Sequence, residues 1–161
     1  MLDVKIFIEL TKDKITVIDF KDYATIKDYK WHSNFQTNKF YARTNVRKSG
    51  GGYKGLLLHR FIMQCPTNMD IDHIDGNPLN NCRDNLRVCT RAENARNRGK
   101  TKANTSGYKG ISFMKDRGSW SSKIRVDYKD YHLGFFPTKE EAYGAYCNAL
   151  NKFHGEFKNK G

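Results

Sequence analysis

The stretch from Met69 to Asn97 constrains the fold of this chain more than any other part of the sequence. Met69–Ile74 alternates between apolar and polar side chains, which is the period of a half-buried β-strand. It leads into Asp75-Gly76-Asn77-Pro78, a turn sequence in which glycine adopts positive φ readily and proline sets the next bend. The stretch therefore predicts a strand that ends in a tight polar loop.

The second half of the same stretch adds another strand and a helix. Leu86–Cys89 is a short apolar run after the loop, and Thr90 begins a capping box that Glu93 completes. A helix that begins at Thr90 carries Asn94 in its first turns. The predicted order is strand, loop, strand and helix.

Four side chains in this frame suit metal-assisted phosphodiester cleavage. Asp72 and His73 are adjacent, Asn85 follows the loop, and Asn94 lies on the predicted helix. A histidine accepts a proton from water near neutral pH, and carboxylate and amide oxygens are ligands for hard divalent ions. The alternative is a polar hairpin with a solvent-exposed histidine, which explains most Asp-His pairs. The order of all four residues favours the nuclease.

The charge of the chain indicates a polyanionic partner. Its 161 residues carry a net charge of +12, and basic residues are in largest excess over residues 98–161. Cationic surfaces bind nucleic acid because binding releases counterions. The sequence has no apolar run long enough to span a bilayer and no secretion signal after Met1, so we expect a soluble, cytoplasmic protein.

The first 55 residues predict a β-rich region. Residues 4–10 and 14–20 are rich in β-branched side chains and form an expected hairpin. Residues 39–46 and 53–58 form a second expected strand pair across a glycine-rich turn. Between the two pairs, residues 22–29 predict a short helix.

A further short helix precedes the Met69–Asn97 stretch. Residues 56–63 are largely apolar, and Pro66 is expected to end the helix. The helix carries His59 beside Arg60. A histidine in this setting is more often a structural hydrogen-bonding group than a metal ligand, so two roles stay open for it, bracing the site or contacting phosphate.

The cysteines of the chain form no Cys-x-x-Cys pair, so the sequence signals no zinc ribbon. In a reducing compartment they are expected to be free and mostly buried thiols. One alternative stays open, a structural zinc ion bound by Cys65, Cys82 and Cys89.

The C-terminal third predicts a small sheet covered by one helix. The three expected strands cover residues 111–114, 120–127 and 131–135. A second capping box over Thr138–Glu141 begins a helix whose apolar face covers the sheet, and Gly155 ends it. Alternation along the middle strand leaves a cationic face on the other side of the sheet. A sheet of this kind can enter the major groove of DNA.

The residues quoted above resemble the HNH endonuclease motif of phage and intron-encoded homing enzymes. Asp72-His73, Asn85 and Asn94 match in order and spacing, and Leu58-His59-Arg60 and residues 84–87 agree as well. The resemblance implies a ββα-metal nuclease core. It also implies a phage- or mobile-element-encoded enzyme that acts in the host cell.

The same resemblance implies a role for each matching residue. His73 is the expected general base, which deprotonates the water that attacks phosphorus. Asp72 and Asn94 are the expected ligands of one Mg²⁺ or Mn²⁺ ion, because their oxygen atoms suit hard cations. Asn85 is the expected second catalytic residue, which orients the loop or His73.

Residues 107–161 resemble the Apetala-two domain of plant ethylene-response factors, which also occurs as a DNA-binding tail on HNH homing enzymes. Tyr108-Lys109-Gly110, Trp120 and Glu140–Tyr146 carry this resemblance. It implies DNA contacts on the sheet from Lys109, Ser112, Lys123, Arg125 and His132. Plant domains have arginine or tryptophan at several of these positions, so we expect weaker base readout here and more phosphate anchoring. Backbone contacts near the linker are expected from Arg96, Arg98, Lys100 and Lys102.

Together these observations predict an α+β fold in four segments. These are an N-terminal β-rich region at 1–55, the nuclease core at 56–98, a basic linker at 99–106, and a three-stranded antiparallel sheet packed on one helix at 107–161.

The predicted function is that of a homing-type endonuclease, which cleaves double-stranded DNA at specific sites with the help of a metal ion and nicks one strand. We expect a monomer, with a dimer as the alternative. The competing hypotheses are a non-catalytic DNA-binding regulator, which the intact Asp-His-Asn set disfavours, and a structural metal-binding module, which the scattered cysteines disfavour.

Overall fold

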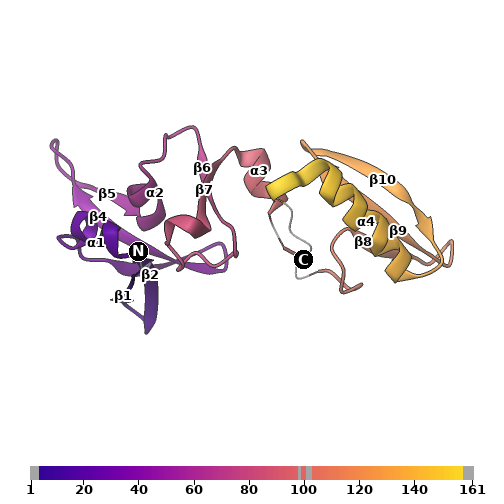
Figure 1. The fold of residues 1–161 in the computed structure, drawn as a ribbon, viewed down its shortest axis with the longest axis horizontal. Helices are drawn as coiled ribbons and strands as arrows, with labels where there is room; N and C mark the ends of the chain where they lie inside the picture. Colours follow the sequence, from indigo (N-terminus) through magenta and orange to yellow (C-terminus); the bar gives the residue numbers. More distant parts are fainter. Residues whose placement is uncertain (1–3, 98, 101–102, 158–161) are drawn as a thin grey trace. The chain divides into compact units, whose positions relative to one another are not determined.

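The computed structural model describes residues 4–97, 99–100 and 103–157 (Figure 1). The chain divides into two compact units, Met1–Thr90 and Arg91–Gly161. Within the described residues both units are mixed α+β: the first contains three small antiparallel sheets and short helices, and the second contains one three-stranded antiparallel sheet with the short helix α3 and the 16-residue helix α4. No helix among these residues has the length and apolar character needed to cross a membrane.

The first unit begins with the predicted hairpin. Strands β1 (Lys5–Leu10) and β2 (Lys14–Asp19) pair antiparallel, from Lys5 opposite Asp19 to Leu10 opposite Lys14. Lys12 and Asp13 adopt positive φ angles of 60° and 53°, which gives the tight turn that joins the strands. Helix α1 (Phe20–Ile26) follows directly, so the predicted helix exists but begins and ends earlier than residues 22–29.

A three-stranded sheet follows, in the order β3-β4-β5. Strands β4 (Lys39–Arg47) and β5 (Tyr53–Leu57) form the predicted pair. Strand β3 (His32–Gln36) was not predicted, because its polar sequence gives no clear apolar alternation. Helix α2 (Leu58–Met63) confirms the predicted helix, but it ends at Gln64, whose left-handed φ of 47° stops it before Pro66.

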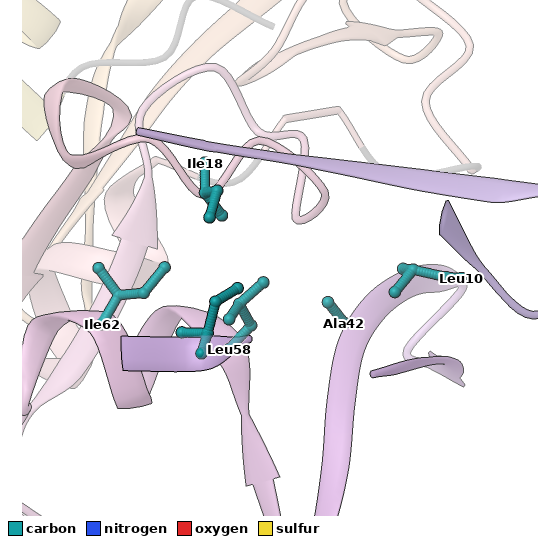
Figure 2. Packing of buried hydrophobic residues seen from close by; sticks show 6 residues of the cluster. Leu10, Ile18, Ala42, Leu58 and Ile62 are labelled. Atoms are coloured by element: carbon teal, nitrogen blue, oxygen red, sulfur yellow. The ribbon is translucent and has the colours of Figure 1, made fainter. Parts of the chain in front are cut away.

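The core of the first unit brings these elements together. Buried apolar side chains come from both hairpin strands, from the sheet and from both helices; they are Leu10, Ile18, Ile26, Ala42, Leu58 and Ile62. Figure 2 shows Leu58 and Ile62 on the α2 side of this core, with Ile18 facing them. Burying an aliphatic side chain of this size contributes about 1.5–3 kcal/mol. The N-terminal region is therefore part of the same core as α2.

Strands β6 (Asp70–His73) and β7 (Leu86–Cys89) form the strand pair predicted for the Met69–Asn97 stretch, with Asp72 opposite Arg87 and His73 opposite Leu86. The connection includes a 3₁₀ turn at Arg83–Asn85. Arg83 anchors this connection to the core, because its guanidinium lies 2.7 Å from the buried Asp22 carboxylate and donates to the Ile62 carbonyl at 3.0 Å.

The second unit begins with helix α3 (Arg91–Arg96), as the first capping box predicts. The sheet has the order β10-β9-β8, with β8 at Ile111–Met114, β9 at Ser119–Val126 and β10 at Lys129–Phe136. Helix α4 (Lys139–His154) lies along one face of this sheet (Figure 1). The Thr138 side chain accepts a hydrogen bond from Glu141 N, and the helix ends at Gly155, as predicted.

The expected strands at 120–127 and 131–135 place the second turn of this sheet at Lys129-Asp130, two residues later than the observed turn. Asp127 and Tyr128 adopt positive φ angles of 47° and 66° and form the two-residue turn, so Lys129 already belongs to β10.

Gly110 permits a close approach between the sheet and helix α4. A Cβ atom at Gly110 would lie 2.5 Å from the Lys123 carbonyl oxygen and 2.5 Å from the Tyr146 ring.

Candidate active site

The side chain of His73 is buried at the end of β6. Its Nε2 atom lies 3.3 Å from Asn81 Oδ1, and its ring contacts the ring of His59 edge-on with centroids 4.9 Å apart. The Tyr41 ring lies near the same edge, at a centroid distance of 6.5 Å. Burial lowers the pKa of His73 below its ordinary value, so the imidazole is neutral near pH 7. A neutral imidazole is the form that accepts a proton.

His59 lies on α2 and is 7% exposed. Burial, with the nearby His73 ring as a smaller cause, lowers the pKa of His59 to about 3. It therefore carries no charge at neutral pH. Its ring lies edge-on to that of His73, and both roles, bracing the site and contacting phosphate, stay predictions.

Asp72 is buried and paired with Arg87, which stands directly opposite it on β7. Two nitrogens of the guanidinium, Nε and Nη2, lie 2.8 Å and 2.5 Å from Asp72 Oδ2. The pair compensates the charge of the buried carboxylate. Carboxylate oxygen suits a hard divalent cation, so the chemistry of Asp72 fits the ion that the motif implies.

Asn85 holds the loop between the two strands. Its amide nitrogen donates to Asp75 Oδ1 at 3.0 Å and to the Asn80 carbonyl at 2.9 Å, and its amide oxygen accepts from Asp75 N at 3.0 Å. A backbone bond from Ile74 N to Asn85 O closes the same turn. These partners are all in the loop, so the contacts of Asn85 match the orienting role that was expected for it.

Asn94 lies on α3, which belongs to the second unit, Arg91–Gly161. Asp72, His73 and Asn85 belong to the first unit. The structure therefore brings the first three predicted residues into one hairpin, and the pairing of Asp72 with Asn94 around one ion stays a prediction.

One other cluster of metal-binding side chains occurs among the described residues, at Asp19, Cys82 and Asp84. The ammonium group of Lys5 lies within it, 2.8 Å from Asp19 Oδ1 and 3.6 Å from Asp84 Oδ2. A cation of the protein itself thus occupies this position. Within the described part of the chain, Cys65, Cys82 and Cys89 form no common metal site, so the zinc alternative gains no support.

Four of the five residues predicted to contact DNA share one face of the C-terminal sheet. Ile124 and Ser122 face α4, so the alternating residues of β9, including Lys123 and Arg125, point to the opposite side. His132 stands opposite Lys123, and Ser112 stands opposite Ser121, which places both on that side as well. All four are exposed, and Arg125 forms an ion pair with Asp130 at 2.9 Å.

Lys109 and Arg96 lie elsewhere in the second unit. Both line a cavity that α4 also borders, through Tyr146 and His154. The Lys109 ammonium donates to the Arg96 carbonyl at 3.0 Å, and burial lowers the pKa of Lys109 to about 8. The Arg96 guanidinium is paired with Asp127 at 2.5 Å. Lys109 therefore does not share the exposed face with Lys123, because its half-buried ammonium is hydrogen-bonded to the last residue of α3.

Of the predicted linker contacts, Lys100 is exposed and donates to the Gly107 carbonyl at 2.9 Å. Arg98 and Lys102 lie outside the described residues.

Sequence reasoning missed two residues that the structure places beside the predicted ones. Asn81 is fully buried against His73, and no local pattern marks it among the other asparagines of its loop. Phe135 is 43% exposed on the side of the sheet that carries Lys123 and His132, and the Arg117 guanidinium lies 4.5 Å from its ring centroid. A β-bulge between His132 and Gly134 turns Phe135 to this side, and a simple alternation of side chains does not predict a bulge.

The comparisons with known proteins match the segment that contains the β6–β7 hairpin and α3. A family model described as HNH endonuclease matches residues 59–96. The chain is 38% identical over 92 residues to a protein of Escherichia phage T7 named Protein 3.8, an alignment that covers 57% of this chain and 75% of the phage protein.

A second similar protein is an uncharacterized HNH endonuclease of Acanthamoeba polyphaga mimivirus. It is 31% identical over 106 residues, an alignment that covers 62% of this chain and 54% of the viral protein, so the match spans about half the length of that relative. No solved structure matches the chain.

Proposed function

The chain belongs to the HNH endonuclease family, whose members are phosphodiester hydrolases, and we propose that it is a site-specific, homing-type endonuclease. In this proposal it nicks double-stranded DNA, and His73 is the general base. The observation that carries the proposal is the buried, neutral imidazole of His73 beside Asp72, inside the segment that the family model matches. The alternative of a non-catalytic DNA-binding regulator gains no support, because Asp72, His73 and Asn94 are all intact.

His73 takes a proton from the attacking water in this proposal. The water oxygen then bonds to phosphorus, and the bond from phosphorus to the 3′ oxygen breaks. A positioned general base contributes about 10²- to 10⁴-fold to the rate of such a step. The lowered pKa of His73 keeps the base in its proton-accepting form across neutral pH.

Asp72 and Asn94 would hold one Mg²⁺ or Mn²⁺ ion per site, and the chemistry that this ion supplies is stabilisation of the negative charge that develops on the phosphate. Arg87 keeps the Asp72 carboxylate in place through its two hydrogen bonds. Asn85 acts on the loop, through its three hydrogen bonds to Asp75 and Asn80, and so is a positioning residue in this scheme.

In this proposal the second unit binds the DNA. We assign residues 107–161 to an Apetala-two-type domain, 99–106 to a basic linker, 56–98 to the nuclease core and 1–55 to a supporting β-rich region. The three-stranded sheet packed on α4 supports the assignment of the tail. Its exposed face, with Ser112, Lys123, Arg125 and His132, is the expected DNA surface. Further backbone contacts are expected from Arg96, Arg98, Lys100 and Lys102, whereas the half-buried ammonium of Lys109 does not support the sheet contact predicted for it.

One chain offers one set of catalytic residues, so the proposed enzyme acts as a monomer and cuts one strand in each event. A dimer that cuts both strands is the alternative. The proposed place of action is the cytoplasm of a host cell, where the DNA substrate is accessible.

The deciding experiment is cleavage of supercoiled plasmid in Mg²⁺ or Mn²⁺. Wild-type protein is expected to produce nicked circles, and His73→Ala is expected to lose about 10²-fold or more of this activity while still binding the same DNA. His32→Ala is the matched control, because this half-buried histidine lies on β3 and outside the site. Cleavage by His73→Ala at the wild-type rate would contradict the proposal.

A further inference from the structure

A chain of hydrogen bonds links His73 to the N-terminal hairpin. His73 Nε2 lies 3.3 Å from Asn81 Oδ1, and Asn81 Nδ2 lies 2.7 Å from Thr16 Oγ1 on β2. The Thr16 hydroxyl in turn lies 2.8 Å from the Leu79 carbonyl oxygen. Thr16 and Asn81 are both 0% exposed, so bulk solvent does not reach the bond between their side chains. The imidazole is thus connected to a strand outside residues 59–96.

The direction of each hydrogen bond in this series follows from the direction of the one before it. A carbonyl oxygen only accepts, so Thr16 must give its single hydroxyl proton to Leu79 O. The hydroxyl oxygen then accepts from Asn81, which fixes the amide nitrogen of Asn81 on that side. The Pro78 carbonyl, 3.3 Å from the same nitrogen, requires the same orientation. The amide oxygen of Asn81 therefore faces His73.

An amide oxygen also only accepts, so the nitrogen of His73 that faces it must carry a proton. In the neutral imidazole, a proton on Nε2 leaves the lone pair on Nδ1. The identity of the basic nitrogen is thereby set by Asn81, and the orientation of Asn81 is set by Thr16.

The backbone holds this arrangement in register. Val17 N donates to Leu79 O at 3.0 Å, and Asn81 N donates to Val17 O at 2.8 Å, so β2 clamps the loop on both sides of Asn80. Val17 and Asn80 form a parallel bridge at this point. The hairpin therefore positions the side chain of Thr16 and the backbone of Asn81 together.

We propose that Asn81 is a positioning residue that fixes His73 in the tautomer with the proton on Nε2, and that Thr16 of the N-terminal hairpin fixes the orientation of Asn81. The proposal rests on the proposed function of His73 as the base, which then accepts the proton of water on Nδ1. In this proposal the N-terminal region takes part in the reaction through its hydrogen bond to Asn81, and this role does not depend on contact with DNA.

The test is the ¹⁵N spectrum of the His73 ring in the full-length protein without DNA, which distinguishes protonated from unprotonated ring nitrogens. The wild type is expected to show a protonated Nε2 and an unprotonated Nδ1. The reverse assignment would overturn the proposal. Because the measurement needs no cleavage, it separates this proposal from the proposed function, which the plasmid assay tests alone.

Two substitutions at Thr16 form a matched pair. Thr16→Val keeps the shape but removes the hydroxyl, so Asn81 loses its fixed orientation, and the His73 spectrum is expected to shift toward a mixture of tautomers. Thr16→Ser keeps the hydroxyl and is expected to keep the wild-type spectrum. In cleavage, Thr16→Val is expected to lower kcat roughly 10- to 100-fold with little change in KM, and Thr16→Ser to restore it. Equal spectra for Thr16→Val and wild type would overturn the proposal.

A second variant keeps the test decisive if Thr16→Val unfolds the hairpin. Asn81→Asp presents an accepting oxygen to His73 in either orientation, so it no longer depends on Thr16. This variant is expected to keep the proton on Nε2. Asn81→Leu, which has a similar volume and no acceptor, is expected to lose that preference. A preserved wild-type tautomer in Asn81→Leu would overturn the role of Asn81.

Discussion

The Arg87 guanidinium lies 2.8 Å and 2.5 Å from a single oxygen of Asp72, directly across the β6–β7 hairpin. The Arg87 side chain is 14% exposed and that of Asp72 is 6% exposed, so this is a buried ion pair. In such pairs the main energetic consequence comes from removing one partner, because an uncompensated charge is then left in the interior.

Arg87→Met is expected to lower the free energy of unfolding by about 3–5 kcal/mol, because it leaves the Asp72 carboxylate buried without its counter-charge. Urea unfolding followed by circular dichroism measures the change. Adding Asp72→Asn to Arg87→Met removes the stranded charge and is expected to restore a large part of the stability. Equal stabilities of wild type and Arg87→Met would contradict a buried, compensated pair.

The stability of the protein is expected to fall as the pH falls below about 6.5, where histidines in the unfolded chain begin to bind protons. The folded-state pKa of His59 is about 3, so His59 stays neutral in the folded protein down to that pH, and the lowered pKa of His73 keeps it neutral to a lower pH than in the unfolded chain. The contribution of neutral His59 is thus complete above pH 6.5 and is lost toward pH 3, and that of His73 falls in the same direction. Each histidine contributes a slope of up to about 1.4 kcal/mol per pH unit.

His59→Gln isolates one of these two contributions. The variant side chain does not titrate, so its unfolding free energy is expected to depend less steeply on pH between 6 and 4 than that of the wild type, by roughly one bound proton. Urea titrations at several pH values measure both slopes. Parallel pH profiles for the two proteins would show that His59 is not held neutral by burial.

Asn85→Asp is expected to loosen the loop, because it replaces two donated hydrogen bonds with repulsion between neighbouring carboxylates. The loss is expected to be about 2 kcal/mol of stability, with a matching fall in plasmid cleavage. The swapped double variant, with Asp75→Asn and Asn85→Asp, restores one donor and one carboxylate and is expected to recover part of both. If the swap recovers nothing, the Asp75–Asn85 contact is not what holds the loop.

Lys123→Ala and Arg125→Ala are each expected to weaken DNA binding and to reduce the slope of log K against log salt by roughly 0.9, the value for one phosphate contact. Lys152→Ala is the matched control. Lys152 is exposed on α4, which covers the other face of the sheet, so its removal is expected to leave the slope unchanged. Fluorescence anisotropy at several salt concentrations gives these slopes. An equal effect of Lys152→Ala would mean that the sheet face is not the DNA surface.

Local signals predicted most of the elements in both units. The turn at Gly76 and the capping box at Thr138 each depend on a few neighbouring residues, and the structure has a positive φ of 73° at the first and a side-chain cap at the second. Alternation along β9 likewise predicted which residues face α4. The strand β3 was missed because its pairing with β4, rather than its own composition, makes it a strand.

The contacts that orient the site depend on residues far apart in the sequence. Asn81 and Thr16 are separated by 65 positions, and nothing near either residue indicates that they meet. The same is true of Arg83, which resembles any other basic loop residue until its bonds to Asp22 are seen. Local patterns therefore predicted that Asp72, His73 and Asn85 belong to one hairpin, but not the distant groups that hold them in place.

The boundary between the two units falls between Thr90 and Arg91, within residues 59–96 that the family model matches. Domain exchange between relatives that joined their halves at this boundary would separate Asp72 and His73 of one parent from Asn94 of the other. For the proposed pairing of Asp72 with Asn94 to persist in a chimera, α3 has to come from the same parent as the hairpin, and the contact between Arg96 and Asp127 has to be re-created in the new sheet. Joining such chains is then a matter of matching one helix to a new sheet, and not of cutting at a linker.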